Sequence, residues 1–197
     1  MIIDKIEDII FPQKSILNDR DWDTEISPII EGYADFWGNE LIQATSSNEI
    51  ENCEKRLQTK LPEDLKIFYL RFGNARLCED LLPVEEMDYL TETWDASFFE
   101  NHTETERQEI FKLIIFADYK GSGNFWCFHK DTKHIFYFNH DSNPNISAMF
   151  DTFEEYLKWM LIFTQGEIGQ FNDGLEENLL EIVQREIGKE RIRIWHY

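Results

Sequence analysis

Three short segments near the middle of the chain are apolar at consecutive positions rather than at alternate ones. They span residues 113–117, 125–128 and 135–138. Their lengths and their β-branched and aromatic content predict strands. A strand with one face in water would alternate apolar and polar side chains, because successive side chains point to opposite faces. The three segments therefore predict buried strands in a sheet that is covered on both faces, with residues 129–134 forming a hairpin between the last two.

Helical patterns flank these segments. Ser46 and Glu49 have the spacing of a capping box, Pro62 suits the first turn of a second helix, and Gly73 is expected to end it. Further helices are expected over residues 103–112, from about residue 152, and over residues 175–187. Less regular patterns predict a short helix at 33–37, an edge strand within 77–84, and a final strand at 191–195.

The charge balance limits the classes of partner. The 197 residues contain 19 Lys and Arg against 39 Asp and Glu, a formal net charge of −20. Such a surface repels phosphate backbones and anionic membranes, so we expect neither as a direct partner. It would attract a basic protein and speed the encounter with it. Solubility alone is the competing explanation of the charge.

Cysteine usage and the N-terminal sequence suggest a compartment. Cys53, Cys78 and Cys127 are odd in number and form no CxxC pair, which argues against a disulfide framework and a structural zinc site. Reduced thiols fit a cytoplasmic protein. The first eight residues lack a basic region followed by an apolar stretch, so we expect no signal peptide. We expect no cofactor.

The order of three segments resembles the SUKH superfamily, in particular its Smi/Knr-like branch of cell-wall-assembly-regulator proteins. The first segment is IENCEKRLQTKLPEDLKIFYLRFGNA, two helices joined by a Leu-Pro step. The second is LLPVEEM, a short strand with an acidic turn. The third is LIIFADYKGSGNFWCFHKDTKHIFYFNHD followed by MFDTFEEYLKWML, a strand, a glycine-rich turn, a hairpin and a helix. The resemblance covers residues 46–163.

This resemblance implies a single α+β domain over residues 1–197, with a central mixed β-sheet packed with helices. The N-terminal helical extension would be residues 1–45, and the C-terminal extension, with its helix, residues 164–197. It also implies a non-enzymatic protein. Many relatives neutralise toxins delivered between bacteria, and others are adaptors or regulators.

Acidic residues on expected turns and strand ends are the candidate partner-binding residues, together with one tryptophan. They are Glu85, Glu86, Asp88, Asp118, Asp131, Asp141 and Trp94. The carboxylates either form a recognition face for a basic partner or are solvated loop charges. Trp94, like Phe98 and Phe99, either anchors a partner or covers the sheet. Trp126 and Tyr137, by contrast, are expected in the core.

Two further patterns could indicate a metal, catalytic or phosphate-binding site. His129, His134 and His140 lie close to acidic residues in the sequence, but a metal or catalytic site needs such groups to converge in space. Gly121 and Gly123 lack the spacing of a phosphate loop and predict a tight turn. We therefore expect no catalytic and no metal-binding residue. The leading hypothesis is an immunity protein that binds a basic toxin domain, possibly a nuclease; an adaptor and an enzyme using residues 129–141 are its rivals.

Overall fold

The computed structural model describes residues 1–100, 102–119, 121–142, 144–169 and 173–196. The chain forms two compact units. The sheet unit comprises residues 43–74 and 79–153, and the helical unit comprises residues 1–42, 75–78 and 154–197. Each unit is assembled from segments that are far apart in the sequence. The expectation of a single domain over residues 1–197 stays a prediction.

A five-stranded sheet forms the centre of the sheet unit, with its strands side by side in sequence order. They are β1 (Asp80–Leu81), β2 (Leu113–Asp118), β3 (Phe125–His129), β4 (Ile135–Phe138) and β5 (Ile146–Phe150). The α+β class and the three strands predicted from consecutive apolar residues are confirmed. Every pairing between described strands is antiparallel, where a mixed sheet was expected. Short connections join β2 to β5, and antiparallel neighbours need no crossover.

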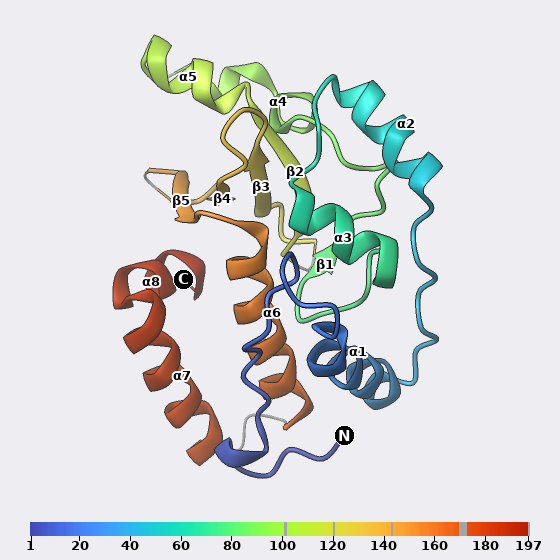
Figure 1. Cartoon of the computed structure of the whole chain (residues 1–197). Helices are drawn as coiled ribbons and strands as arrows, with labels where there is room; N and C mark the ends of the chain where they lie inside the picture. The colour runs from blue at the N-terminus through green and yellow to red at the C-terminus, as the bar shows by residue number, and fades with distance from the viewer. Residues whose placement is uncertain (101, 120, 143, 170–172, 197) are drawn as a thin grey trace. The chain divides into compact units, whose positions relative to one another are not determined.

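One face of this sheet packs against α3 and is called the α3 face. Helix α3 (Glu63–Phe72) follows α2 (Ser47–Leu57), and Figure 1 shows both helices on one side of the strands. Phe153 joins α3 to the sheet, because its ring lies 5.8 Å from that of Phe68 and 5.7 Å from that of Phe116. Trp126 and Tyr137 are opposite each other and fully buried, as expected of core residues. The α3 face therefore holds the aromatic core of the unit.

The opposite face, called the α5 face, is covered by the chain between β1 and β2. This segment contains α4 (Leu90–Thr93), the 3-10 helix η2 (Ala96–Phe99) and α5 (Glu104–Ile110). Thr103 caps α5, within the helix expected over residues 103–112. Buried residues of the segment and of the strands form one apolar cluster. Its members are Leu90, Phe99, Ile110, Leu113, Ile115, Cys127 and Phe138. Both faces of the sheet are thus covered, as the consecutive apolar positions predict.

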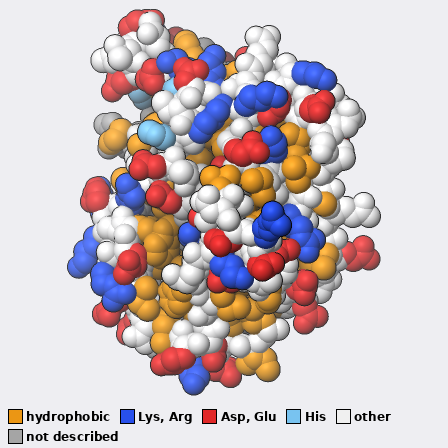
Figure 2. Space-filling view, viewed as in Figure 1, with side chains coloured by type: hydrophobic (Ala, Val, Ile, Leu, Met, Phe, Trp, Pro, Cys, Tyr) orange, Lys and Arg blue, Asp and Glu red, His pale blue; other side chains and the backbone are white. Residues whose placement is uncertain are grey.

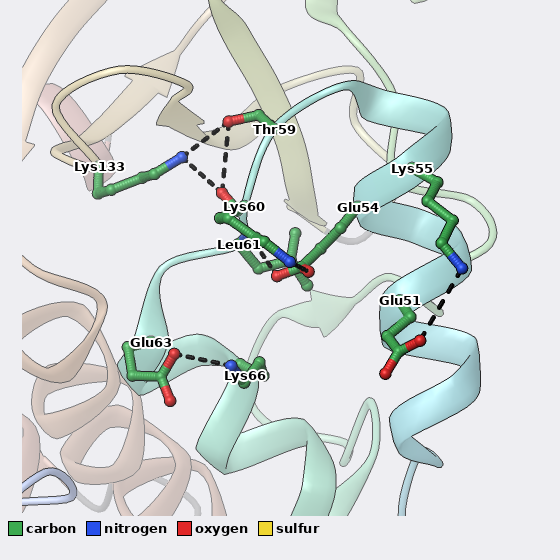
Figure 3. Close-up of polar contacts among 9 residues, drawn as sticks. All are labelled: Glu51, Glu54, Lys55, Thr59, Lys60, Leu61, Glu63, Lys66 and Lys133. Atoms are coloured by element: carbon green, nitrogen blue, oxygen red, sulfur yellow. Dashed lines mark hydrogen bonds and ion pairs between the residues drawn. The ribbon is translucent and has the colours of Figure 1, made fainter.

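The junction between α2 and α3 is fastened to the β3–β4 hairpin by polar contacts (Figure 3). The buried carboxylate of Glu54 accepts a hydrogen bond of 3.2 Å from the backbone N–H of Leu61 and pairs with Lys60. From the hairpin, Nζ of Lys133 donates to Oγ1 of Thr59 at 3.0 Å and to the carbonyl of Lys60. These contacts hold the two helices in register with the sheet. The predicted capping box of Ser46 and Glu49 begins α2.

The helical unit contains η1 (Ile6–Asp8), α1 (Asp23–Trp37), α6 (Phe153–Ile168, of which residues 154–168 belong to this unit), α7 (Asp173–Ile187) and α8 (Lys189–His196). The buried side chain of Gln165 fixes the N-terminal segment to α6. It accepts from the N–H of Ile10 at 2.7 Å and donates to the carbonyl of the same residue at 2.8 Å. The hydroxyl of Tyr33 donates to Glu167 at 2.6 Å, which ties α1 to α6.

Several expectations for the chain ends and loops are corrected. Helix α1 is much longer than the expected 33–37, although it ends as predicted at Gly38, whose φ is +65°. Residues 191–195 belong to α8 rather than to a strand. Two isoleucines two positions apart fit either period, and in the helix only Ile192 of the pair is fully buried. Strand β5 was not predicted.

The cysteines and the long helices give two further results. Cys53, Cys78 and Cys127 are buried and form no disulfide. Burial raises the pKa of the Cys127 thiol well above its ordinary value, so this group is an apolar core residue in practice. Within the described ranges, the helices are all too short or too polar to cross a bilayer.

Candidate partner-binding site

A pocket of about 220 Å³ opens on the α5 face of the sheet unit. Leu113, Phe136 and Ile146 contribute apolar side chains from β2, β4 and β5, and α5 contributes Ile110. Phe136 and Ile146 are only half-buried, although they pack against the apolar cluster. The pocket is thus the place where the covering segment leaves side chains of the sheet partly exposed to solvent.

Two carboxylates of α5 line the same pocket. Glu106 and Glu109 are three residues apart and therefore lie on one face of the helix. Hydrogen bonds from the side chain and the backbone of Thr103 lower the pKa of Glu106. A hydrogen bond from Lys112, 2.9 Å away, is the main reason that the pKa of Glu109 is also lowered. Both groups are consequently ionised at neutral pH and give the pocket a negative wall.

Two histidines complete the lining, each held by a contact that defines its tautomer. Nε2 of His102 lies 2.9 Å from the amide oxygen of Asn145, an atom that can only accept, so Nε2 carries the proton. Nδ1 of His102 is then an acceptor, and it is buried with no hydrogen-bond partner among the residues that the structure describes. Nδ1 of His129 accepts from the backbone N–H groups of Asp131 and Thr132, at 3.2 and 3.1 Å.

His129 is deeply buried although it lies at the end of a strand. Its relative exposure is 2%, and its Nε2 lies 3.1 Å from Oε2 of Glu109. Burial lowers the pKa of His129, against a smaller opposing effect of the carboxylates of Glu109 and Asp131. The ring is therefore neutral at pH 7 and acts as a fixed cap for the hairpin.

An aromatic cluster lies on the same face, packed on Phe138 of the apolar cluster. The indole of Trp94 lies 4.9 Å from the ring of Phe98 and 5.5 Å from that of Phe138, measured between centroids. On its other side it stacks on His140, whose Nε2 is 3.2 Å from Oδ2 of Asp141. Trp94, Phe98 and His140 are half-buried. They therefore expose aromatic surface while their rings stay packed against neighbouring side chains. The pocket and this aromatic cluster together are called the α5-face site.

Trp94 and Asp141 are therefore the predicted residues that the α5-face site contains. Glu85 and Glu86 are exposed on the turn after β1. Asp88 pairs with Arg56 at 3.7 Å, and Asp131 pairs with Lys112 at 3.5 Å. The seven predicted residues come from five separate turns and element ends. Their role in partner binding stays a prediction.

Asp118 ends β2, directly opposite Asp80 in the sheet register. Burial raises the pKa of Asp118, and the carboxylate of Asp80 adds to the shift, while the N–H of Gly121 opposes it. Gly121 and Gly123 have φ angles of +72° and +83°, as the predicted turn requires. Asp118, Gly121 and Gly123 therefore have a structural role, at the end of β2 and in the turn that follows it.

Sequence reasoning missed most of the α5-face site, namely His102, Glu106, Glu109, Phe136 and Ile146. A usable signal was nevertheless present in the charge distribution. Residues 79–109 contain 11 Asp and Glu and one basic residue, Arg107. Figure 2 shows several acidic side chains over α5, among a few basic ones. The acidic character is thus concentrated on the segment that covers the α5 face.

The described residues contain no group of three or more His, Cys, Asp or Glu side chains that could hold a metal ion. His129 lies at the β3 end that adjoins Glu109, His140 follows the opposite end of β4, and His134 is exposed. The three histidines of residues 129–140 thus do not converge.

These features define an α+β protein with an acidic, partly aromatic surface on one face of its sheet. The model of the SMI1/KNR4 family, SUKH-1, matches residues 44–159, which is more than half of the chain. The chain therefore belongs to the SMI1/KNR4 (SUKH-1) family, as the resemblance indicated. No match was found among curated proteins or among solved structures.

Proposed function

We propose that the chain is a non-enzymatic cytoplasmic immunity protein, which binds and neutralises a basic toxin domain of a bacterial polymorphic toxin system. Family membership is consistent with this role. The observation that supports it most is the α5-face site, where half-buried aromatic side chains lie next to a segment with 11 acidic residues and one basic residue. Aromatic residues at the centre of an interface, with charges around them, are typical of protein recognition.

Charge and aromatic surface would have separate roles in this interaction. The net charge of −20 would steer a basic partner and set the association rate. Trp94, Phe98 and Phe136 would be covered by the partner and set the dissociation rate. Neutralisation follows where the bound chain covers the active cleft of the toxin domain.

Affinity purification of the tagged chain from its own host tests the proposal. We expect one stoichiometric partner, a large polypeptide with a basic C-terminal domain. Expression of that domain alone should stop growth, and co-expression of the chain should restore it. Several substoichiometric partners whose expression is harmless would instead favour an adaptor, and a toxic partner against which the chain gives no protection would contradict immunity.

A further inference from the structure

The pocket of the α5-face site has a size that suits one side chain. Its volume is about 220 Å³, below the range of roughly 300–1,000 Å³ that is usual for small-molecule sites. Its apolar lining includes Leu113, Phe136, Pro144 and Ile146. Such a lining favours an occupant with an apolar stem.

The wall of the pocket favours a cation at the end of that stem. Glu106 and Glu109 are both exposed on α5 and ionised, and they lie one helical turn apart. An anionic occupant would meet two like charges there. A cation would be attracted by both, and most by Glu106, because Glu109 already pairs with Lys112 at 2.9 Å. The attraction is stronger than in open solvent because one side of the pocket is apolar.

The hydrogen-bond inventory distinguishes arginine from lysine. The carboxylates of Glu106 and Glu109 both bring accessible acceptor oxygens to the pocket. A guanidinium carries five N–H donors in a planar fork and stacks on aromatic rings, whereas an ammonium is a compact, strongly hydrated charge. The half-buried ring of Phe136 supplies such a stacking surface.

We propose that this pocket binds an arginine side chain of the partner. The stem lies on Ile146 and Leu113, the guanidinium lies against Phe136, and its N–H groups are shared between the carboxylates of Glu106 and Glu109. The inference rests on the proposed function for the identity of the partner as a basic protein. It goes beyond that function by assigning the residue that the partner inserts.

The full chain can be titrated with N-acetyl-arginine amide while backbone and methyl NMR signals are recorded. We expect saturable shifts confined to the pocket residues, with a Kd on the order of 1–10 mM, as befits a single side chain without the rest of an interface. N-acetyl-citrulline amide has nearly the same shape without the charge and should cause no saturable shift. N-acetyl-lysine amide should bind more weakly than the arginine compound.

Two substitutions on α5 form a matched pair. Glu106→Gln removes a pocket charge but keeps the capping box with Thr103, because glutamine serves in that motif as well. Glu104→Gln removes an exposed charge of the same helix that does not line the pocket. We expect Glu106→Gln to weaken arginine binding about two- to fivefold, the range of one exposed charge pair, and Glu104→Gln to leave it unchanged.

Equal shifts with citrulline, shifts located outside the pocket, or no saturable shift up to about 50 mM ligand would overturn the inference. Equal effects of the two glutamine variants would overturn it as well. Because this titration needs no partner, the pocket assignment can fail while the toxin is still neutralised. Conversely, a chain that binds arginine but protects no cell would contradict immunity and leave the pocket assignment standing.

Discussion

The indole of Trp94 stacks on the imidazole of His140, with ring centroids 5.3 Å apart and 25° between the planes. One ring follows α4 and the other follows β4, so the contact joins the acidic covering segment to the sheet. The two rings are half-buried and form the exposed part of the aromatic cluster. Substitution of one of these two side chains should therefore change the affinity for the partner more than other single substitutions do.

Trp94→Ala should lower the affinity for the co-purified partner at least about tenfold, as truncation of an interface tryptophan commonly does. It should also reduce the free energy of unfolding by about 1–3 kcal/mol, because the indole packs on Phe98 and Phe138. Calorimetric titration and urea unfolding measure the two effects. Trp37→Ala is the matched control, since Trp37 on α1 is 56% exposed and lies in the other unit. A loss of affinity in Trp37→Ala with none in Trp94→Ala would place the interface elsewhere.

His129 should make the stability of the protein depend on pH. Burial lowers its folded-state pKa, so the unfolded chain binds more protons over the interval between the folded pKa and the unfolded value of about 6.5. The free energy of unfolding therefore decreases as pH falls below about 6.5. Protonation would also remove the acceptor that Nδ1 offers to the N–H groups of Asp131 and Thr132.

Urea unfolding between pH 8 and pH 5 measures this dependence. His129→Asn keeps an acceptor near the position of Nδ1 but does not titrate, so its stability should change less over this interval. His134→Asn, on the same hairpin but exposed, should follow the unsubstituted chain. If His129→Asn loses as much stability as the unsubstituted chain does, the buried histidine is not the responsible group.

Lys133 should stabilise the sheet unit through the hydrogen bonds of its amine rather than through a salt bridge. Its Nζ donates to Oγ1 of Thr59 and to two backbone carbonyls, and burial lowers the pKa of the amine. Lys133→Met keeps the stem and removes the donors, and it should reduce the free energy of unfolding by about 1–3 kcal/mol. Lys55→Met, at an exposed residue whose ion pair with Glu51 is 3.9 Å long, should change it little. Equal results from the two variants in urea unfolding would show that the Lys133 contacts contribute nothing.

Electrostatic steering predicts that salt affects association more than dissociation. With a net charge of −20 on one partner and a basic toxin domain as the other, the association rate should fall several-fold between roughly 50 and 500 mM salt. The dissociation rate should change much less, because the aromatic contacts are not screened. Stopped-flow fluorescence of the tryptophans measures both rates. An association rate independent of salt would remove the steering role of the charge.

The strands that could be predicted are those whose local sequence is unambiguous. Residues 113–117, 125–128 and 135–138 are apolar at every position or nearly so, and only burial on both faces accommodates that. Strand β5 was not predicted because Ser147 interrupts its apolar run. The sequence of residues 191–195 predicts a strand, whereas the segment is helical, because it is too short to distinguish periods of 2 and 3.6.

The site was harder to predict because it depends on packing between distant segments. Trp94 and Asp141 could be selected as an aromatic and an acid outside the apolar runs. Phe136 looked like any other core residue, and only the structure shows that α5 leaves it half-buried. Glu106 is one of many acidic residues in the sequence, and only the structure shows that it lines the same pocket as Phe136.

Hydrogen–deuterium exchange of the complex with the co-purified partner tests the central claim most directly. Binding at the α5-face site should protect amides in residues 90–110 and 136–148 that exchange more readily in the free protein. Residues of α1 and α7 should exchange at the same rate in both states. Protection confined to α1 or α7, with none over α5 and β4, would contradict the assignment of the α5 face as the surface that holds the toxin domain.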